Sequence, residues 1–272
     1  MLQPANIGQR RIKVQQFNCP AASASRAAIA GLLGLAVLLL FRQKRPERGD
    51  LMSLVIVALG VVVGFPLLTA LALKHVTSAH SIIFVGLLPL ATAIFGVLRG
   101  GERPRPAFWL FSCIGSTLVA GFALMQGVTA SPVGDGLMLA AIVVCGLGYA
   151  EGAALSRRLG GWQVICWALT LSLPIMLVLT FATLPPSFAA VGSHAWIGLA
   201  YVSLFSMLIG FVFWYRGLAQ GGIAAVGQLQ LLQPFFGLAL AATLLHEQVS
   251  PLMVVVTLGV VACVFGAKKF AR

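Results

Sequence analysis

Long apolar segments recur along the whole chain and are separated by short polar or glycine- and proline-containing breaks. A transmembrane helix needs about 20 predominantly apolar residues to cross the hydrocarbon core of a bilayer. Nine segments fit this requirement, at 21–41, 51–73, 81–98, 107–126, 136–155, 162–184, 195–215, 223–245 and 251–267. Their residues do not alternate between apolar and polar types as those of a transmembrane barrel do. The pattern predicts an all-α polytopic membrane protein with about nine transmembrane helices.

Composition supports the same fold class. Of 272 residues, 60% are hydrophobic and 9% are charged, and the mean hydropathy is +1.00. Soluble domains carry about 25% charged residues on average, so this chain could not cover its surface in water. Lipid must be the solvent over most of the molecule, and no room is left for a soluble domain longer than a tail.

The net charge of +12 would be compatible with nucleic acid, but the positions of the charges favour a membrane topology instead. Lys and Arg cluster in alternate loops, whereas the loops at 127–135 and 184–194 hold none. The clusters are Arg42, Lys44, Arg45 and Arg48; Arg99, Arg103 and Arg105; Arg157 and Arg158; Arg216; and Lys268, Lys269 and Arg272. Basic loops stay in the cytoplasm. The charges therefore predict a multi-pass protein of the bacterial inner membrane with a cytoplasmic C-terminus and no nucleic-acid partner.

Special residues recur at a spacing of 145 residues. Pro89 and Pro234, Glu102 and Glu247, and Pro106 and Pro251 are three such pairs. The spacing predicts a duplicated unit, with a first repeat of four helices at 21–127 and a second of five at 135–270. The segment 1–20 is expected not to span, so the first repeat would lack its opening helix.

A complete unit of five helices inserts in opposite orientations in its two copies. Inverted repeats are typical of secondary transporters, because alternating access needs two mirrored conformations of similar energy. The duplication therefore predicts transport.

Two stretches of the chain resemble the second part of an EamA domain. They are "LALKHVTSAHSIIFVGLLPLATAIFGVLRGGERPRPAFWLFSCIGSTLVAGFAL" and "YRGLAQGGIAAVGQLQLLQPFFGLALAATLLHEQVSPLMVVVTLGVVACVFG". Each has a small-residue helix start, a mid-helix proline (Pro89, Pro234), an acid at the helix end (Glu102, Glu247) and a glycine in the last helix. EamA domains are paired in the drug/metabolite transporter superfamily. The resemblance implies the ten-helix family fold, here without its first helix, in an exporter of small organic metabolites or drugs.

Polar residues inside the predicted spans are the candidates for a substrate cavity, because burying them in lipid is costly. Glu151 is the only acidic side chain within a predicted span. Either it pairs with Arg157, Arg158 or water near the cytoplasmic interface, or it faces the cavity as a proton acceptor or a cation anchor. Tyr149 would then add an aromatic wall, and protons become a candidate coupling ion.

Arg26, in "SASRAAIAG", resembles the arginine of the family's second helix and is a further candidate. It either snorkels outward or orients a substrate carboxylate. Trp167 lies deeper in its span than Trp162 and could line the cavity, but packing within the membrane is the favoured interpretation.

Glutamines gather in "AVGQLQLLQPFFG". Gln230 and Gln233, three residues apart, share one helix face, and Pro234 can bend that helix. They either bond to neighbouring helices or border a water-filled path, with Pro89 and Pro234 as bends of gating helices. The first repeat has Pro89 but no glutamines, so a polar site would be asymmetric.

No motif for catalysis, cofactor binding or metal binding is present. The five cysteines lack paired spacing, and the histidines are scattered at span ends. We therefore expect no enzyme, cofactor or metal site. The expected partners are a small-molecule substrate, membrane lipid and a candidate second copy of the chain. The alternatives are an inactive transporter fragment, a chain whose true start lies upstream of Met1, or a membrane-embedded lipid-modifying enzyme.

Overall fold

The computed structural model describes residues 20–125, 131–183, 192–233, 235–236, 239 and 251–271, and their regular structure is entirely helical. Residues 1–19, Pro234 and Glu247 lie outside the described residues. The long elements are α2 (Pro20–Leu40), α3 (Arg48–Val57), η1 (Ala58–Gly64), α4 (Phe65–Ala72), α5 (Ser78–Val85), α6 (Leu88–Gly100), α7 (Pro106–Leu124), α8 (Pro132–Leu159), α9 (Gly161–Thr183), α10 (Ser193–Tyr201), η2 (Val202–Ile209), α11 (Gly210–Gly221), α12 (Ile223–Gly227), η3 (Gln228–Leu232) and α14 (Pro251–Phe270).

Seven helical segments of the described residues are long and apolar enough to cross a membrane, which confirms the predicted fold class. They are Ser23–Leu40, Arg48–Ala72, His80–Gly100, Pro106–Leu124, Pro132–Leu159, Gly161–Thr183 and Ser193–Gly221. The helix α14 adds 20 residues, which rise about 30 Å along a helix axis. Ile223–Leu232 is a shorter apolar segment.

Several helices extend beyond the predicted spans, and these differences change which charges lie within them. The helix α3 begins at Arg48 and α8 at Pro132, so Asp50 and Asp135 lie inside helices together with Glu151. Asp50 and Asp135 lie in the first turns of these helices, outside the predicted spans, whereas Glu151 lies inside one. Hydropathy sets the extent of a span only approximately, because helices continue into the polar interface where charged side chains are tolerated.

Irregular turns interrupt three of the long segments. The segments η1 and η2 are π-helical, whereas η3 is a 3-10 helix. The predicted span 81–98 is divided into α5 and α6 at Gly86 and Leu87, directly before Pro89 in the first turn of α6. Proline lacks the N–H that would continue the hydrogen-bond ladder, so Pro89 fits at this break.

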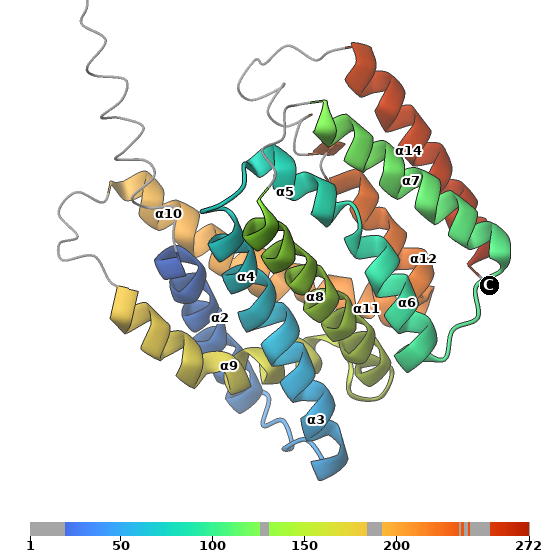
Figure 1. Cartoon of the computed structure of the whole chain (residues 1–272). Helices are drawn as coiled ribbons and strands as arrows, with labels where there is room; N and C mark the ends of the chain where they lie inside the picture. The colour runs from blue at the N-terminus through green and yellow to red at the C-terminus, as the bar shows by residue number, and fades with distance from the viewer. Residues whose placement is uncertain are drawn as a thin grey trace, which may run out of the picture.

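Helices whose boundaries are 145 residues apart pack against each other in opposite directions. The helix α7 begins at Pro106 and α14 at Pro251, and the two lie side by side (Figure 1). The Arg105 N–H, just before α7, donates to the carbonyl oxygen of Phe270 at the end of α14 at 3.0 Å. The residue that precedes one helix therefore meets the last residue of the other.

The helices α2 and α9 form a second antiparallel pair. A Cβ built on Gly31 would lie 3.0 Å from the carbonyl oxygen of Leu169, and one on Gly34 would lie 3.4 Å from Cα of Cys166. Residue numbers rise along α2 as they fall along α9, and the glycines allow the two backbones to approach closely, as in other membrane helix pairs.

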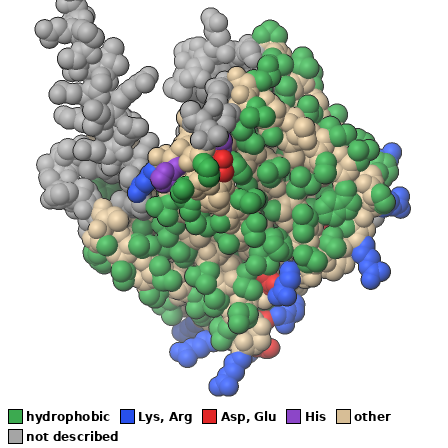
Figure 2. Space-filling model, in the orientation of Figure 1, with side chains coloured by type: hydrophobic (Ala, Val, Ile, Leu, Met, Phe, Trp, Pro, Cys, Tyr) green, Lys and Arg blue, Asp and Glu red, His purple; other side chains and the backbone are tan. Residues whose placement is uncertain are grey.

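Charged and apolar side chains occupy different parts of the surface. Hydrophobic side chains cover most of the visible face, and Lys and Arg gather mainly along its lower and right-hand edges (Figure 2). The ends of α2, α6, α8 and α14 and the starts of α3, α7 and α12 meet at the end of the molecule that carries the basic loops. We call this end of the molecule the basic end.

Candidate substrate cavity and its ion pairs

A cavity of about 300 Å³ lies between α8, α11 and η3. Its lining residues combine three aromatic side chains, one leucine and two amides: Tyr149, Trp214, Phe236, Leu229, Gln230 and Gln233. Ligand pockets typically begin at about 300 Å³ and consist of apolar walls with a few polar groups. This cavity brings together three residues of the predicted substrate site, namely Tyr149, Gln230 and Gln233.

The lining residues lie at mid-depth along the helix axes, although Leu229, Gln233 and Phe236 are exposed. Tyr149 is ten residues before Leu159, the last residue of α8, which corresponds to about 15 Å along the axis. Gln230 is seven residues after Ile223, the first residue of α12. Because the hydrocarbon core is about 30 Å thick, these residues lie near its middle, where transporters bind their substrates.

The local helix type places both glutamines on one wall. Residues Gln228–Leu232 form a 3-10 helix, in which positions three residues apart lie directly above one another. Gln230 and Gln233 therefore face the cavity together. Gln228, at another angle, is fully buried and accepts a hydrogen bond from the hydroxyl of Ser112 in α7 at 3.0 Å.

Aromatic rings form the opposite wall. The rings of Tyr149 and Trp214 meet edge to face with centroids 5.6 Å apart, and Phe211 lies 6.2 Å from Tyr149. Edge-to-face pairs hold aromatic side chains in defined orientations. The cavity thus has an aromatic side and an amide side, and none of its described lining residues is charged.

Glu151 lies on the other face of α8. It is two residues from Tyr149, which is about 200° around an α-helix at 3.6 residues per turn. The Glu151 carboxylate is 5% exposed, accepts a hydrogen bond from the Ser53 hydroxyl at 2.9 Å and pairs with Arg99. The structure therefore pairs Glu151 with α3 and α6, not with the cavity or with Arg157 or Arg158.

Four ion pairs join side chains of the described residues, and each has one partner on α8. Glu151 pairs with Arg99, Arg157 with Glu102 at 3.2 Å, and Arg158 with Asp50. The fourth pair joins Asp135 to Nε2 of His80 at 2.6 Å, near the opposite end of the bundle. Three of the four therefore tie the last turns of α8 to helices of the first half of the chain.

The remaining predicted site residues occupy other positions. Arg26 lies in α2, and its Nε is buried without a hydrogen-bond partner. Trp167 packs against the apolar core formed by α2, α9 and their neighbours. The structure brings neither of them to the cavity lining. Pro89 is buried in the first turn of α6.

Sequence reasoning missed Trp214, Phe236 and Arg99. Trp214 and Phe236 line the cavity, but an aromatic residue in an apolar span looks the same whether it faces lipid, core or cavity. Arg99 was assigned to a loop because it lies at the end of an apolar run, although it is inside α6. Its partner Glu151 lies 52 residues further along the chain, and a sequence pattern within one helix does not identify a contact between two helices.

Comparison with known proteins identifies the family of this chain. The model of the EamA-like transporter family matches residues 7–125 and 132–267. This chain belongs to that family. It is 68% identical over 262 residues to the uncharacterized transporter YdeK of Bacillus subtilis (strain 168), covering 96% of this chain and 91% of YdeK. The membership confirms the predicted family and makes this EamA protein a membrane transporter rather than an enzyme.

Two more distant similarities cover most of this EamA chain. It is 25% identical over 234 residues to a probable terminal-alkyne amino-acid exporter of Streptantibioticus cattleyicolor, covering 86% of this chain and 76% of the exporter. A solved crystal structure matches with a TM-score of 0.77 at 19% identity, covering 91% of this chain and 88% of the other. The structural match supports the fold, and both halves of the EamA chain are included in it.

Proposed function

We propose that this EamA protein is a secondary exporter of small organic solutes in the bacterial inner membrane, working by alternating access between two inverted repeats. The observation that carries the proposal is a mid-depth cavity of about 300 Å³ in a bundle whose basic end is crossed by three ion pairs from α8. A substrate site near the membrane middle, accessible from one side at a time, is what alternating access requires.

The antiparallel pairs α2–α9 and α7–α14 support the repeat arrangement. Elements at equivalent places in two repeats face each other across the axis that relates the repeats. If the axis ran along the membrane normal, such elements would be parallel, whereas an axis in the membrane plane makes them antiparallel. The contacts of Arg105 with Phe270 and of Gly34 with Cys166 are antiparallel, which favours inverted repeats.

The cavity lining favours substrates without net charge. Two amides offer donors and acceptors, and the rings of Tyr149, Trp214 and Phe236 offer apolar faces. A buried substrate with a net charge would need a partner of opposite charge, and the described lining residues provide none. We propose neutral or zwitterionic solutes with an apolar portion. The name of the Streptantibioticus relative, an amino-acid exporter, supports both this class and the outward direction.

Counterflow in proteoliposomes tests this proposal. Vesicles preloaded with single neutral amino acids, nucleosides or cationic drugs are exposed to the labelled form of the same compound. We expect accumulation of an uncharged or zwitterionic compound, lost in Gln230→Ala and Gln233→Ala. The control is Gln43→Ala, in the loop between α2 and α3 and away from the cavity lining. Accumulation of only strongly cationic or anionic compounds would contradict the substrate class.

A further inference from the structure

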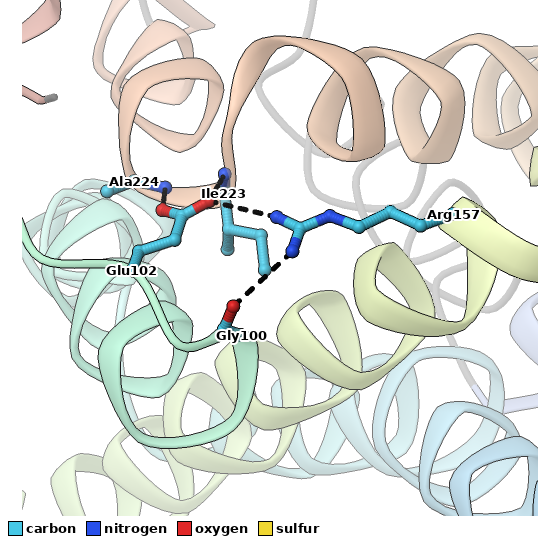
Figure 3. Close-up of polar contacts among 5 residues, drawn as sticks. All are labelled: Gly100, Glu102, Arg157, Ile223 and Ala224. Carbon is cyan, nitrogen blue, oxygen red and sulfur yellow. Dashed lines mark hydrogen bonds and ion pairs between the residues drawn. The ribbon is translucent and has the colours of Figure 1, made fainter.

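One carboxylate joins the end of α6 to the start of α12. Glu102 accepts hydrogen bonds from the backbone N–H groups of Ile223 at 2.6 Å and Ala224 at 2.8 Å, using one oxygen for each (Figure 3). Arg157 of α8 donates to the same carboxylate at 3.2 Å and to the carbonyl oxygen of Gly100 at 3.3 Å. Three helices therefore meet at this side chain.

Local sequence fixes where Glu102 lies. Gly101 ends α6 with a φ of +68°, a left-handed conformation that glycine adopts without strain. The N–H groups of Gly101 and Glu102 both donate to the carbonyl oxygen of Gly96, the second at 3.2 Å. On the other side, Gly222 has a φ of +95° immediately before α12. Both chain reversals need glycine, and together they bring the carboxylate to the first N–H groups of α12.

An apolar contact accompanies the polar one. The Ile223 side chain is fully buried and lies over two glycines of α6. A Cβ built on Gly96 would lie 3.0 Å from Cγ2 of Ile223, and one built on Gly100 would lie 2.5 Å from its Cδ1. The start of α12 is therefore seated in a notch at the end of α6, and a larger residue at Gly100 would require the Ile223 side chain to shift.

This junction differs from the other ion pairs of the basic end. The pairs of Glu151 with Arg99 and of Asp50 with Arg158 join α8 to α6 and α3. Glu102 also bonds to α12, the short helix that leads into η3 and the cavity residues Gln230 and Gln233. Separation of α12 from α6 would expose two backbone donors and the carboxylate at once.

We propose that Glu102 is a positioning residue for transport, which keeps the basic end closed by holding α12 on α6, with Arg157 aligning its carboxylate. The inference rests on the proposed alternating access. Weakening the junction shifts the equilibrium towards the conformation open at the basic end, because only the closed conformation contains these bonds. The same substitution leaves the cavity lining unchanged.

Labelling of one cysteine from each membrane face tests the inference without knowledge of the substrate. Gln233→Cys, in a background without other cysteines, places a thiol on the cavity wall. Vesicles of both orientations are treated with a membrane-impermeant maleimide. In Glu102→Gln we expect labelling from the face with the basic loops to rise about fivefold or more, and labelling from the opposite face to fall.

Two further variants and a control complete the experiment. Ile223→Ala empties the notch without changing charge, and Arg157→Gln removes the aligning cation; both should shift labelling in the same direction. Glu47→Gln, an exposed acid at the start of α3, should leave both rates unchanged. If Glu102→Gln does not fold, Ile223→Ala and Arg157→Gln give the answer.

Each outcome bears on one proposal. Unchanged labelling in all three junction variants, or an equal rise from both faces with a lower melting temperature, would overturn the role of Glu102. If the thiol is labelled from one face only in every variant and in the wild type, alternating access itself fails along with the inference. If the wild type is labelled from both faces and the junction variants are labelled at the same rates as the wild type, the inference alone is wrong.

Discussion

Gly152 of α8 lies directly against the ring of Tyr215 in α11. A Cβ built on Gly152 would overlap this ring, and the Tyr215 hydroxyl donates to the carbonyl oxygen of Gly148 at 3.3 Å. Both residues are buried. The same two helices carry Tyr149 and Trp214, so this contact fixes the spacing of the aromatic wall of the cavity.

Gly152→Ala should therefore destabilise the protein. Overpacking of a close contact costs about 1–3 kcal/mol, and the Tyr215 ring has to move away from α8. Gly136→Ala is the matched control on the same helix, because a Cβ there would meet nothing within 4 Å. Melting temperatures in detergent measure both variants. A Gly152→Ala protein as stable as the Gly136→Ala protein would show that α8 and α11 are not in tight contact.

Hydropathy predicted the helices but not their partners. The predicted spans match because a segment in lipid must satisfy its own backbone hydrogen bonds, which leaves helix as the solution. Glu151 and Tyr149 were grouped in one cavity, although two residues along an α-helix point in nearly opposite directions. The pairing of Arg99 with Glu151 depends on how α6 packs on α8. The periodicity within one helix carries no information about this packing.

For the glutamines, in contrast, spacing along the chain was sufficient to predict a shared helix face. Gln230 and Gln233 were placed on one face by their spacing of three, and the cavity has both in its lining. The spacing gives this result for a 3-10 helix as well as for an α-helix, so the prediction did not depend on recognising η3. The tryptophans could not be distinguished in this way, because an indole is compatible with lipid, core and cavity alike.

Trp214 and Trp167 form a matched pair for testing the cavity. Trp214 lines it and meets Tyr149 edge to face, whereas Trp167 packs against the core around α9. We expect Trp214→Leu to weaken substrate binding about 2- to 10-fold, the equivalent of about 0.5–1.5 kcal/mol from a lost aromatic contact. Trp167→Leu should instead lower the melting temperature with substrate affinity unchanged. Concentration-dependent counterflow and thermal unfolding measure the two effects, and a reversed pattern would contradict the cavity assignment.

The basic loops predict the orientation of the chain. A reporter fused after Arg272 should be active in the cytoplasm, and one inserted within 184–194 should be active outside it, because Lys- and Arg-rich loops stay in the cytoplasm. The basic end, with Arg157, Arg158 and the Glu102 junction, would then face the cytoplasm. Reporter activity on the opposite sides at both sites would refute the topology and reverse the proposed direction of opening.

Glu151 remains the candidate for coupling to protons, and its surroundings give two distinct expectations. If Glu151 is a structural partner of Arg99 and Ser53, its replacement by glutamine should lower the melting temperature, since a hydrogen bond to a charged group contributes about 1.5–3 kcal/mol. As a proton carrier, the same variant should lose the pH dependence of transport while still exchanging substrate across the membrane.

Transport by proteoliposomes across a pH series separates these two roles. The measurement compares wild type with Glu151→Gln and with Asp50→Asn, which removes the charge of the buried Asp50 that pairs with the exposed Arg158 and leaves Glu151 in place. We expect the pH profile to flatten in Glu151→Gln and to persist in Asp50→Asn, even if both variants melt at lower temperature. The pairing of Glu151 joins α8 to α3 and α6. A proton on this carboxyl would weaken the pairing and loosen the basic end in the step in which the cavity opens towards that end. A pH profile that is the same in all three proteins would refute proton coupling through Glu151 and leave the carboxylate with a structural role.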